Sequence, residues 1–545
     1  MPLPRRHLTL PALALALALP TAHAAEGTVT TVAGTVPGLS GDDGPATAAQ
    51  MNGPEGTATA ADGALLIADT QNDSVRRVAP GGIITTIAGN GQGFFGDGGQ
   101  AADAEFNAPS DVAVLADGSI LIADTGNHRI RRIAPNGIIS TVAGSARGLA
   151  GDGGPATAAL LNGPRGLTPL TGGGYLIADS GNGRIRAVSA AGVISTVAGT
   201  SPGFAGDGGQ AAAARLDDPR SVSVVAGGGL LIADLGNRRI RRVGPDGVIS
   251  TVAGGGAGRI DDAVPALRTR LGGPADVIPL TNGGFLMADT LADRLRRVTP
   301  LGTIVTVAGE RRALGGDGGP ASGASLDTPT SLTLQPGGGL LVGDTGNARV
   351  RRLSEIGTLP PPEALKTVGV SPFGGAVSVR PRATAAFIGL READLAPNES
   401  VVDATSGTVD LTVRAPDSGA EATARVSGGR VLVVQPIGDT AVADLRLNGP
   451  LACSARAVSG RAQETASKKA PSRGVRVKVR GRYRTTGRYA VAVANGTAWT
   501  MTDRCDRTVI RVTEGTVTVR DLRLGRSVRV KAGRTYVALA RAPRG

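Results

Sequence analysis

Two series of aspartates recur through residues 27–358 with a spacing of 55 residues. One series ends short apolar runs such as Ile-Ala-Asp, and the other lies mostly in Gly-Asp-Gly-Gly. Clustered carboxylates suggest Ca²⁺, which takes several oxygen ligands, but an Asp before Gly also closes an Asx turn or caps a short helix. We favour this structural role and predict no metal. The two series are Asp69, Asp124, Asp179, Asp234, Asp289 and Asp344, and Asp42, Asp97, Asp152, Asp207, Asp262 and Asp317.

Arginines follow the first series of aspartates by five residues in most repeats. We expect Arg129, Arg184, Arg239 and Arg349 to pair with these aspartates, because opposite charges this close in sequence meet readily across a turn. Together with Asn127 and both aspartate series, they are our candidate binding residues. The adjacent pairs such as Arg131-Arg132 suggest salt bridges between neighbouring units or a solvated rim.

Histidines are too few for common catalytic sites. The chain has three, of which His7 and His23 lie in a predicted leader and His128 lies in a turn. One histidine cannot form a zinc triad. Its turn position, where other repeats have Asp, Gly, Arg or Ala, does not indicate the base of a Ser-His-Asp site. We therefore predict no catalytic residue and no cofactor. A carboxylate-based or calcium-dependent enzyme stays open as the alternative.

Each 55-residue unit has the pattern of four short strands. In the third unit these are 166–170, 175–178, 184–188 and 193–198, separated by Gly-rich turns. Four-stranded units repeated radially form a β-propeller. Residues 28–33 form a fourth strand with no unit before it, and the sixth unit lacks a clear fourth strand. We expect the N-terminal strand to complete the last blade, since an open array would leave two unpaired edges.

The repeated motifs resemble the NHL-repeat family. The residues that carry the resemblance are Ile122-Ala-Asp-Thr-Gly-Asn-His-Arg-Ile-Arg-Arg132, with versions in all six units. The longer pattern from Val142-Ala-Gly to Gly151-Asp-Gly-Gly-Pro-Ala is similar to the variant of teneurin NHL propellers. This resemblance implies a six-bladed β-propeller over residues 25–358. The resemblance also implies that, if the chain were the alternative enzyme, it would be a lyase or lactonase with its site in the central channel. The fifth unit departs from the pattern, with Arg259-Ile-Asp-Asp262 in place of the Gly-rich loop.

The connections between units identify the face for binding. In an up-and-down blade, the turn between the second and third strands shares a face with the connection to the next blade. That connection is long, and long loops on a rigid scaffold often carry function. Pro45, Pro155 and Pro320 predict a short helix in it.

Residues 1–24 have the features of a signal peptide. Arg5 and Arg6 precede an apolar stretch, and Ala22-His-Ala24 fits a cleavage site. Arg5-Arg6 leaves both general and twin-arginine export open. We expect a secreted or envelope-associated protein without a membrane span, in which Cys453 and Cys505 form a disulfide.

The last third of the chain differs in charge from the repeats. Residues 360–545 contain 30 basic and 15 acidic residues, whereas residues 26–359 contain 26 and 30. After a Pro-rich linker at 359–372, residues 373–545 alternate apolar and polar residues, which predicts a β-sandwich-like or β-helical domain, with a flexible insertion at 456–474. Val401–Val409 and Arg511–Val519 resemble FecR-like domains, which implies a non-catalytic signalling module. The polyanion-binding candidates are Arg476, Lys478, Arg480, Arg482, Arg484 and Arg488.

These features predict an all-β, exported, non-enzymatic binding or scaffold protein. Its propeller face would bind a protein or polysaccharide, and its basic domain would associate with anionic envelope polymer by salt-sensitive attraction. We expect a monomer, and we do not expect nucleic acid as the partner because aromatic residues are scarce.

Overall fold

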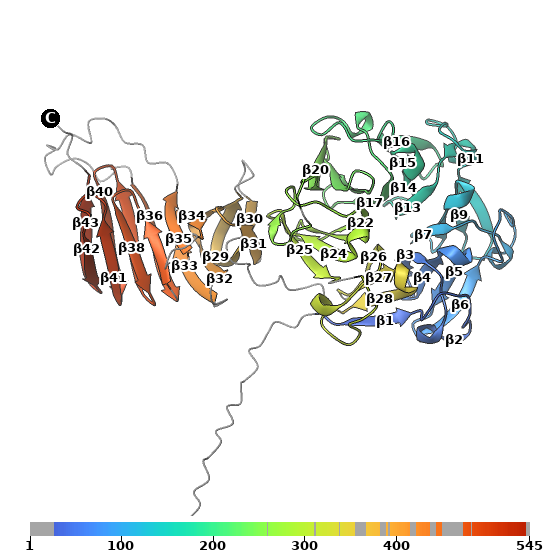
Figure 1. Cartoon of the computed structure of the whole chain (residues 1–545). Helices are drawn as coiled ribbons and strands as arrows, with labels where there is room; N and C mark the ends of the chain where they lie inside the picture. Colours follow the sequence, from blue (N-terminus) through green and yellow to red (C-terminus); the bar gives the residue numbers. More distant parts are fainter. Residues whose placement is uncertain are drawn as a thin grey trace, which may run out of the picture.

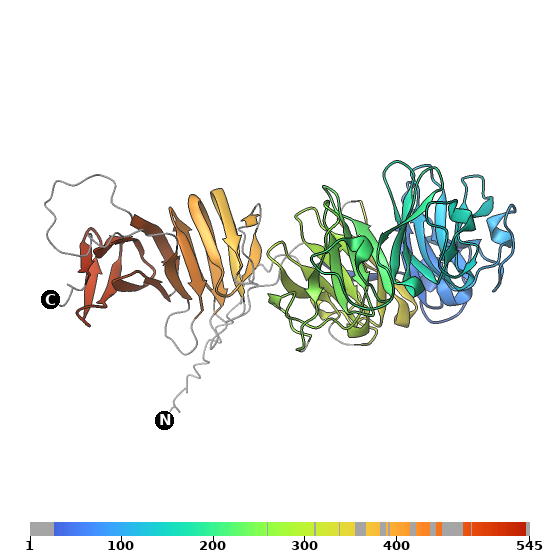
Figure 2. The same ribbon diagram turned by 90° about the horizontal axis from the view of Figure 1, so that it is seen from above.

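A computed structural model describes residues 27–540, except 259, 310–311, 337, 355–366, 382–387, 391–392, 415–420, 436–442, 449–471 and 481. It consists of a six-bladed β-propeller and a second, two-layered β domain (Figures 1 and 2). The predicted leader and Cys453 lie outside these residues. None of the helical turns in the described part of the chain is long and apolar enough to cross a membrane.

The innermost strand of each blade begins with proline and lies around the propeller axis (Figure 1). These strands are β3 (Pro54–Thr59), β7 (Pro109–Val114), β13 (Pro164–Pro169), β17 (Pro219–Val224), β22 (Pro274–Pro279) and β26 (Pro329–Leu334). The second strands end at the first aspartate series and are β4 (Leu65–Asp69), β8 (Ile120–Asp124), β14 (Tyr175–Asp179), β18 (Leu230–Asp234), β23 (Phe285–Asp289) and β27 (Leu340–Asp344).

The third strand of each blade alternates buried apolar residues with arginines. These strands are β5 (Ser74–Val78), β9 (Arg129–Ile133), β15 (Arg184–Val188), β19 (Arg239–Val243), β24 (Arg294–Val298) and β28 (Arg349–Leu353). The outer strands are β6 (Ile83–Ala88), β10 (Ile139–Ala143), β16 (Ile194–Ala198), β20 (Ile249–Gly254), β25 (Thr303–Ala308) and, from the N-terminus, β1 (Val29–Ala33). β1 pairs antiparallel with β28, so the predicted closure of the ring is confirmed.

The long connections descend along the outer edge of a blade and return to its inner strand. β2 (Gly44–Pro45) and β21 (Val264–Pro265) add to β6 and β25, and β11 (Ala146–Arg147) pairs with β12 (Leu160–Leu161). A 3₁₀ turn follows Pro45, Pro155 and Pro320, where the sequence predicts a short helix. The turns in these connections are η1 (Ala46–Ala48), η3 (Ala101–Asp103), η5 (Ala156–Ala158), η7 (Ala211–Ala213) and η9 (Ala321–Gly323).

A second set of 3₁₀ turns joins the second and third strands of most blades. Each of these turns ends in a left-handed residue, at Asp73, His128, Gly183, Asp293 or Ala348. The turns are η2 (Thr70–Asn72), η4 (Thr125–Asn127), η6 (Ser180–Asn182), η8 (Thr290–Ala292) and η10 (Thr345–Asn347).

The glycine that ends each Val-Ala-Gly motif is required by a close backbone approach. Gly199 has φ of +91°, and a Cβ there would lie 2.2 Å from the Gly183 carbonyl oxygen. An L-side chain is disfavoured by this φ and excluded by this distance. The recurrence of glycine at this position therefore follows from the passage of the long connection against the third strand.

The C-terminal domain begins with a long antiparallel pair and then separates into two layers. β29 (Thr367–Arg380) pairs with β32 (Val401–Arg414), while β30 (Ile388–Leu390) and β31 (Asp394–Pro397) pair with β29. β29 therefore starts inside the range expected for the linker. The two ends of β32 then pair with β33 and β34 respectively, which begins the two layers.

The two layers enclose one apolar core that includes Trp499 and Tyr483. The antiparallel pairing confirms a sandwich, since a β-helix would need parallel strands. One layer has β33 (Glu421–Ser427), β36 (Ser472–Arg480), β39 (Ala498–Arg504), β40 (Arg507–Glu514) and β43 (Thr535–Leu539). The other has β34 (Arg430–Val434), β35 (Ala443–Asn448), β37 (Arg482–Thr486), β38 (Ala490–Asn495), β41 (Thr516–Asp521) and β42 (Ser527–Lys531), with β35 and β37 parallel.

The two domains touch through the fifth blade, where β25 lies beside β31 (Figure 1). Leu301, in the turn before β25, is buried and belongs to the core of the C-terminal domain. Its N–H donates to Asp394 Oδ2 at 3.2 Å, and Thr303 Oγ1 donates to the Leu395 carbonyl at 2.7 Å. Burial raises the pKa of Asp394 to about 6. The contact is therefore a small buried interface between the domains.

We predict that Leu301→Asp separates the domains while leaving both folded. The substitution removes buried apolar area worth about 1.5–3 kcal/mol and places a charge beside Asp394. Small-angle scattering of the full chain should show a larger radius of gyration. Asn136→Asp, at the equivalent but exposed turn of the second blade, is the matched control. An unchanged scattering profile for Leu301→Asp would contradict the interface.

Candidate functional site

Each blade contains a buried arginine held between the two aspartate series. In the fourth blade, Arg241 Nη1 lies 3.3 Å from Asp234 Oδ2, and Arg241 Nη2 lies 2.8 Å from Asp207 Oδ1. Arg241 and Asp234 are fully buried, whereas Asp207 is partly exposed. We call each such set a clamp. The six clamps are Asp42–Arg76–Asp69, Asp97–Arg131–Asp124, Asp152–Arg186–Asp179, Asp207–Arg241–Asp234, Asp262–Arg296–Asp289 and Asp317–Arg351–Asp344.

The strand-end aspartate of a clamp also receives hydrogen bonds. Asp234 accepts from the Asp217 N–H at 2.7 Å and from Asn237 Nδ2 at 2.8 Å. Burial raises the pKa of Asp234 to about 6, and these donors together with Arg241 oppose the rise. The lone pairs of this carboxylate are thus used inside the blade.

The structure places the sequence candidates in three environments. The series from Asp69 to Asp344 has no exposed surface, so a large partner cannot contact it directly. The loop series from Asp42 to Asp317 is partly exposed, with one oxygen bound by the clamp arginine. Asn127 donates to Asp124 and to the Gly93 carbonyl.

The expected pairing of aspartates with the nearer arginines is wrong. The clamp arginine stands seven residues after the strand-end aspartate, two residues beyond the arginine expected to pair with it. Arg129 instead donates to the Gly144 carbonyl, and Arg184, Arg239 and Arg349 donate to the carbonyls of Asn182, Asn237 and Asn347. Of the adjacent pair, Arg131 is buried and belongs to the clamp, whereas Arg132 is partly exposed.

The clamps leave little opportunity for a calcium ion at the aspartates. A guanidinium already lies between the two carboxylates of every repeat. The described residues contain no group of three or more His, Cys, Asp or Glu suited to a metal ion. His128 is also used structurally, since its Nδ1 accepts from the Gly163 N–H of the next blade at 3.0 Å, and burial lowers its pKa.

A ring of exposed apolar side chains lies in the loops that the clamps hold in place. The sequence analysis did not identify these residues. The positions again differ by 55 residues, and each side chain is about half exposed. Arg259 occupies this position in the fifth repeat and lies outside the described residues. We call the other five the apolar rim: Leu39, Phe94, Leu149, Phe204 and Leu314.

The clamps hold the backbone on both sides of a rim residue. For Phe204, the Gly203 carbonyl accepts from Asn237 at 2.8 Å, and the Ala205 carbonyl accepts from Arg241 at 3.3 Å. Because both flanking carbonyls point into the blade, the side chain between them is presented outward. Arg239 lies over the Phe204 ring at 3.9 Å, which limits rotation of the ring.

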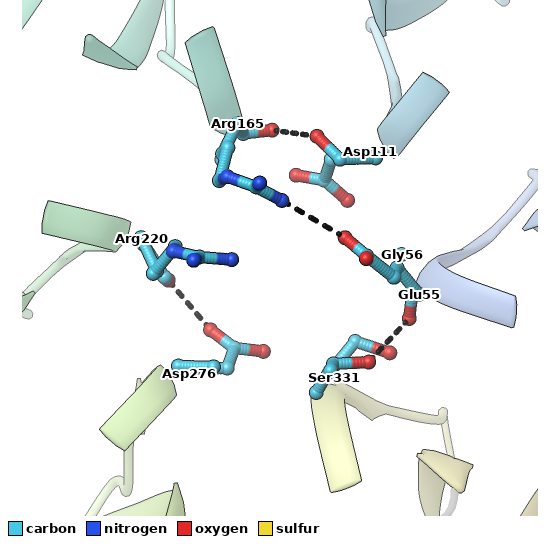
Figure 3. Close-up of a pocket in the computed structure, with 12 residues that line it drawn as sticks. Glu55, Gly56, Asp111, Arg165, Arg220, Asp276 and Ser331 are labelled. Atoms are coloured by element: carbon cyan, nitrogen blue, oxygen red, sulfur yellow. Dashed lines mark hydrogen bonds and ion pairs between the residues drawn. The ribbon is translucent and has the colours of Figure 1, made fainter. Parts of the chain in front are cut away.

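A second set of equivalent positions lines a central hollow with about 410 Å³ of empty space, including the part open to solvent. The hollow lies at the start of the inner strands, the end at which Pro54 pairs with Asp69, and therefore at the end that carries the long connections. Figure 3 shows side chains from different blades pointing into it. The inward ring contains Glu55, Ser110, Arg165, Arg220, Ala275 and Thr330.

Two carboxylates next to this ring join neighbouring blades. Asp111 Oδ2 accepts from the Leu167 N–H at 2.8 Å, and Asp276 Oδ2 accepts from the Leu332 N–H at 2.7 Å. Burial raises the pKa of both, and at Asp111 the charges of Asp276 and Glu55 add to the rise. Comparison of the six repeats position by position would have singled out the inward ring, because its residues vary while the proline that precedes them recurs in every repeat.

The basic candidates of the C-terminal domain lie mainly on β36. Arg476, Lys478 and Arg480 are exposed and alternate with buried valines. Lys478 pairs with Glu514 at 3.0 Å. Arg484 is partly buried and bound to Asp444, and Arg488 contacts the Tyr489 ring. The side chain of Arg482 is not described.

Cys505 is buried at the end of β39. Because Cys453 lies outside the described residues, the pairing of these two cysteines stays a prediction.

The NHL repeat model matches residues 106–133, in the second blade, and the same clamp recurs in all six blades. The chain is similar to mouse Teneurin-4, with 30% identity over 229 residues, covering 37% of this chain and 8% of that protein. Zebrafish Teneurin-3 is 27% identical over 363 residues, covering 57% and 12%. The chain thus spans a small part of these relatives. The FecR-like resemblance stays a prediction.

Solved structures include similar folds at low identity. An auxiliary nutrient binding protein from Bacteroides ovatus has 16% identity and a TM-score of 0.44, over 60% of this chain and 76% of that one. Virginiamycin B lyase from Staphylococcus aureus has 15% identity and a TM-score of 0.35, over 53% and 77%.

We predict that Arg241→Met lowers the free energy of unfolding by about 3–5 kcal/mol, because it leaves two carboxylates without their buried partner. Urea or thermal unfolding of the full chain measures the change. Arg242→Met, at the neighbouring exposed position, should change stability by less than about 0.5 kcal/mol. Equal effects at both positions would contradict a stabilising role of the clamp.

Proposed function

We propose that the chain is an exported, non-enzymatic binding protein. Its propeller would hold a protein partner at the end that carries the long connections, and its C-terminal domain would associate with anionic envelope polymer. The observation that carries the first part is the apolar rim, because exposed large apolar side chains held in a rigid array are typical of protein contact sites. Export rests on the leader motif at residues 1–24.

The rim is suited to binding because its backbone is fixed before a partner arrives. Each rim residue of the fourth and sixth blades lies between one carbonyl bound by the clamp arginine and one bound by the asparagine of the adjoining turn. A fixed loop loses little conformational entropy on association. Arginines over Phe94 and Phe204 add the residue type that is enriched, with aromatics, at interface centres.

The central hollow supports binding over the calcium-dependent enzyme that the sequence left open. Arg165 and Arg220 bring two positive charges to the place where a channel cation would lie. These two charges repel a divalent ion, and the Asp111 and Asp276 carboxylates of the same hollow already accept backbone N–H groups.

We predict that Phe94→Ser with Phe204→Ser weakens protein capture by at least about tenfold, since truncating central apolar anchors commonly costs that much. Cross-linking of the full chain in the exported protein fraction, followed by quantitative mass spectrometry, measures it. Val224→Ser with Leu334→Ser removes similarly exposed apolar side chains from the hairpins at the opposite end and should leave capture unchanged. The proposal fails if the rim variant retains the same proteins as the wild type.

The basic domain provides a separate prediction. Binding of the full chain to polygalacturonate should be strong at low salt and fall as salt increases. Arg476→Gln with Lys478→Gln and Arg480→Gln should weaken binding and flatten its dependence on salt. The same loss of charge on the propeller, by Arg77→Gln, Arg132→Gln and Arg242→Gln, should have little effect. Equal losses in both variants would show only a net-charge effect and would overturn the assignment to β36.

A further inference from the structure

We infer that the central hollow is a binding site for a small carboxylate that also carries hydroxyl or ammonium groups. This site is separate from the apolar rim and goes beyond the function proposed above. Its residues come from the inward ring and break the sixfold repetition of the blades (Figure 3).

The positive side of the hollow is formed by the third and fourth blades. Arg165 meets Glu55 through one contact of 3.4 Å. Arg220 uses its Nε for Asp218, and its two terminal nitrogens have no partner among the described residues. The hollow therefore contains guanidinium N–H groups that are aimed inward and not used.

The two arginines also act on each other. Burial lowers the pKa of Arg165, and the charge of Arg220 lowers it further. Two like charges in a partly enclosed space repel, so an anion placed between them would be attracted by both. The planar fork of a guanidinium suits a carboxylate, which it binds through two parallel hydrogen bonds.

The opposite side of the hollow presents oxygen atoms that can accept hydrogen bonds from a ligand. Glu55 lies across the axis on the first blade, and burial raises its pKa while Arg165 and Arg220 lower it. Thr330, of the neighbouring sixth blade, lines the same side. An anion without donor groups would be repelled by these oxygen atoms. Hydroxyl or ammonium groups on the ligand would instead donate hydrogen bonds to them.

The size of the hollow limits the ligand. The space of about 410 Å³ includes a part that is open to solvent, so the enclosed part is smaller and admits only a small ligand group. The described lining has no aromatic ring, so the ligand is held by polar contacts and not by stacking. A hydroxylated or amino acid satisfies both sides, with its carboxylate toward the third and fourth blades.

The test is calorimetric titration of the full chain with D-glucuronate and L-serine, which combine a carboxylate with donors, and with acetate and D-glucose, which lack one or the other. We expect glucuronate or serine to bind more tightly than acetate, and glucose not to bind. Arg165→Gln and Arg220→Gln should each weaken binding by at least about tenfold, the effect of losing a charge-assisted contact. Arg132→Gln, on the outer surface, is the control.

Arg220 is the decisive position because it is partly exposed, and we therefore expect Arg220→Gln to fold. If Arg165→Gln fails to fold, Arg220→Gln still decides the result. The inference is overturned if neither glucuronate nor serine binds, if Arg220→Gln binds them as the wild type does, or if glucose binds equally well. Each of these outcomes leaves the capture experiment on the apolar rim unaffected, so the two proposals fail separately.

Discussion

The interaction on which the propeller depends is the buried arginine held between two aspartates. Burying charges is costly, and leaving one without its partner is costlier still, so every repeat must bring all three residues together. The arginine and the loop aspartate are 34 residues apart in sequence. Their pairing therefore helps to fix the path of the long connection across the outer edge of each blade, together with backbone hydrogen bonds such as that from the Gly98 N–H to the Ile139 carbonyl.

The clamps separate positions that must repeat from positions that are free to vary. Side chains that form the clamp or its turn recur in nearly every unit. Side chains that point outward at the rim or inward at the axis take no part in the clamp. Apolar residues collect on the rim, while Glu55, Arg165 and Arg220 break the symmetry at the centre. A symmetric scaffold thus presents one repetitive surface and one asymmetric hollow.

The fifth repeat shows how a local departure from the pattern serves the whole chain. Its turn has Leu301 where the second repeat has Asn136, and this leucine packs into the core of the C-terminal domain. An apolar residue in a solvent-exposed turn would be unfavourable, so the departure is explained only by the neighbouring domain. The basic face of β36 belongs to a domain whose orientation is restrained by this contact.

The sequence by itself determined the six blades, the closing strand and the β character of the second domain, because period, turn residues and alternation are local properties. It also separated the acidic propeller from the basic domain. Only the tertiary structure decided which arginine each aspartate meets, since Arg129 and Arg131 are both near Asp124 in sequence and strand geometry selects the second. It likewise decided that the rim faces outward and that residues 55 positions apart converge on one hollow. Those facts depend on contacts between distant segments, which no local pattern specifies.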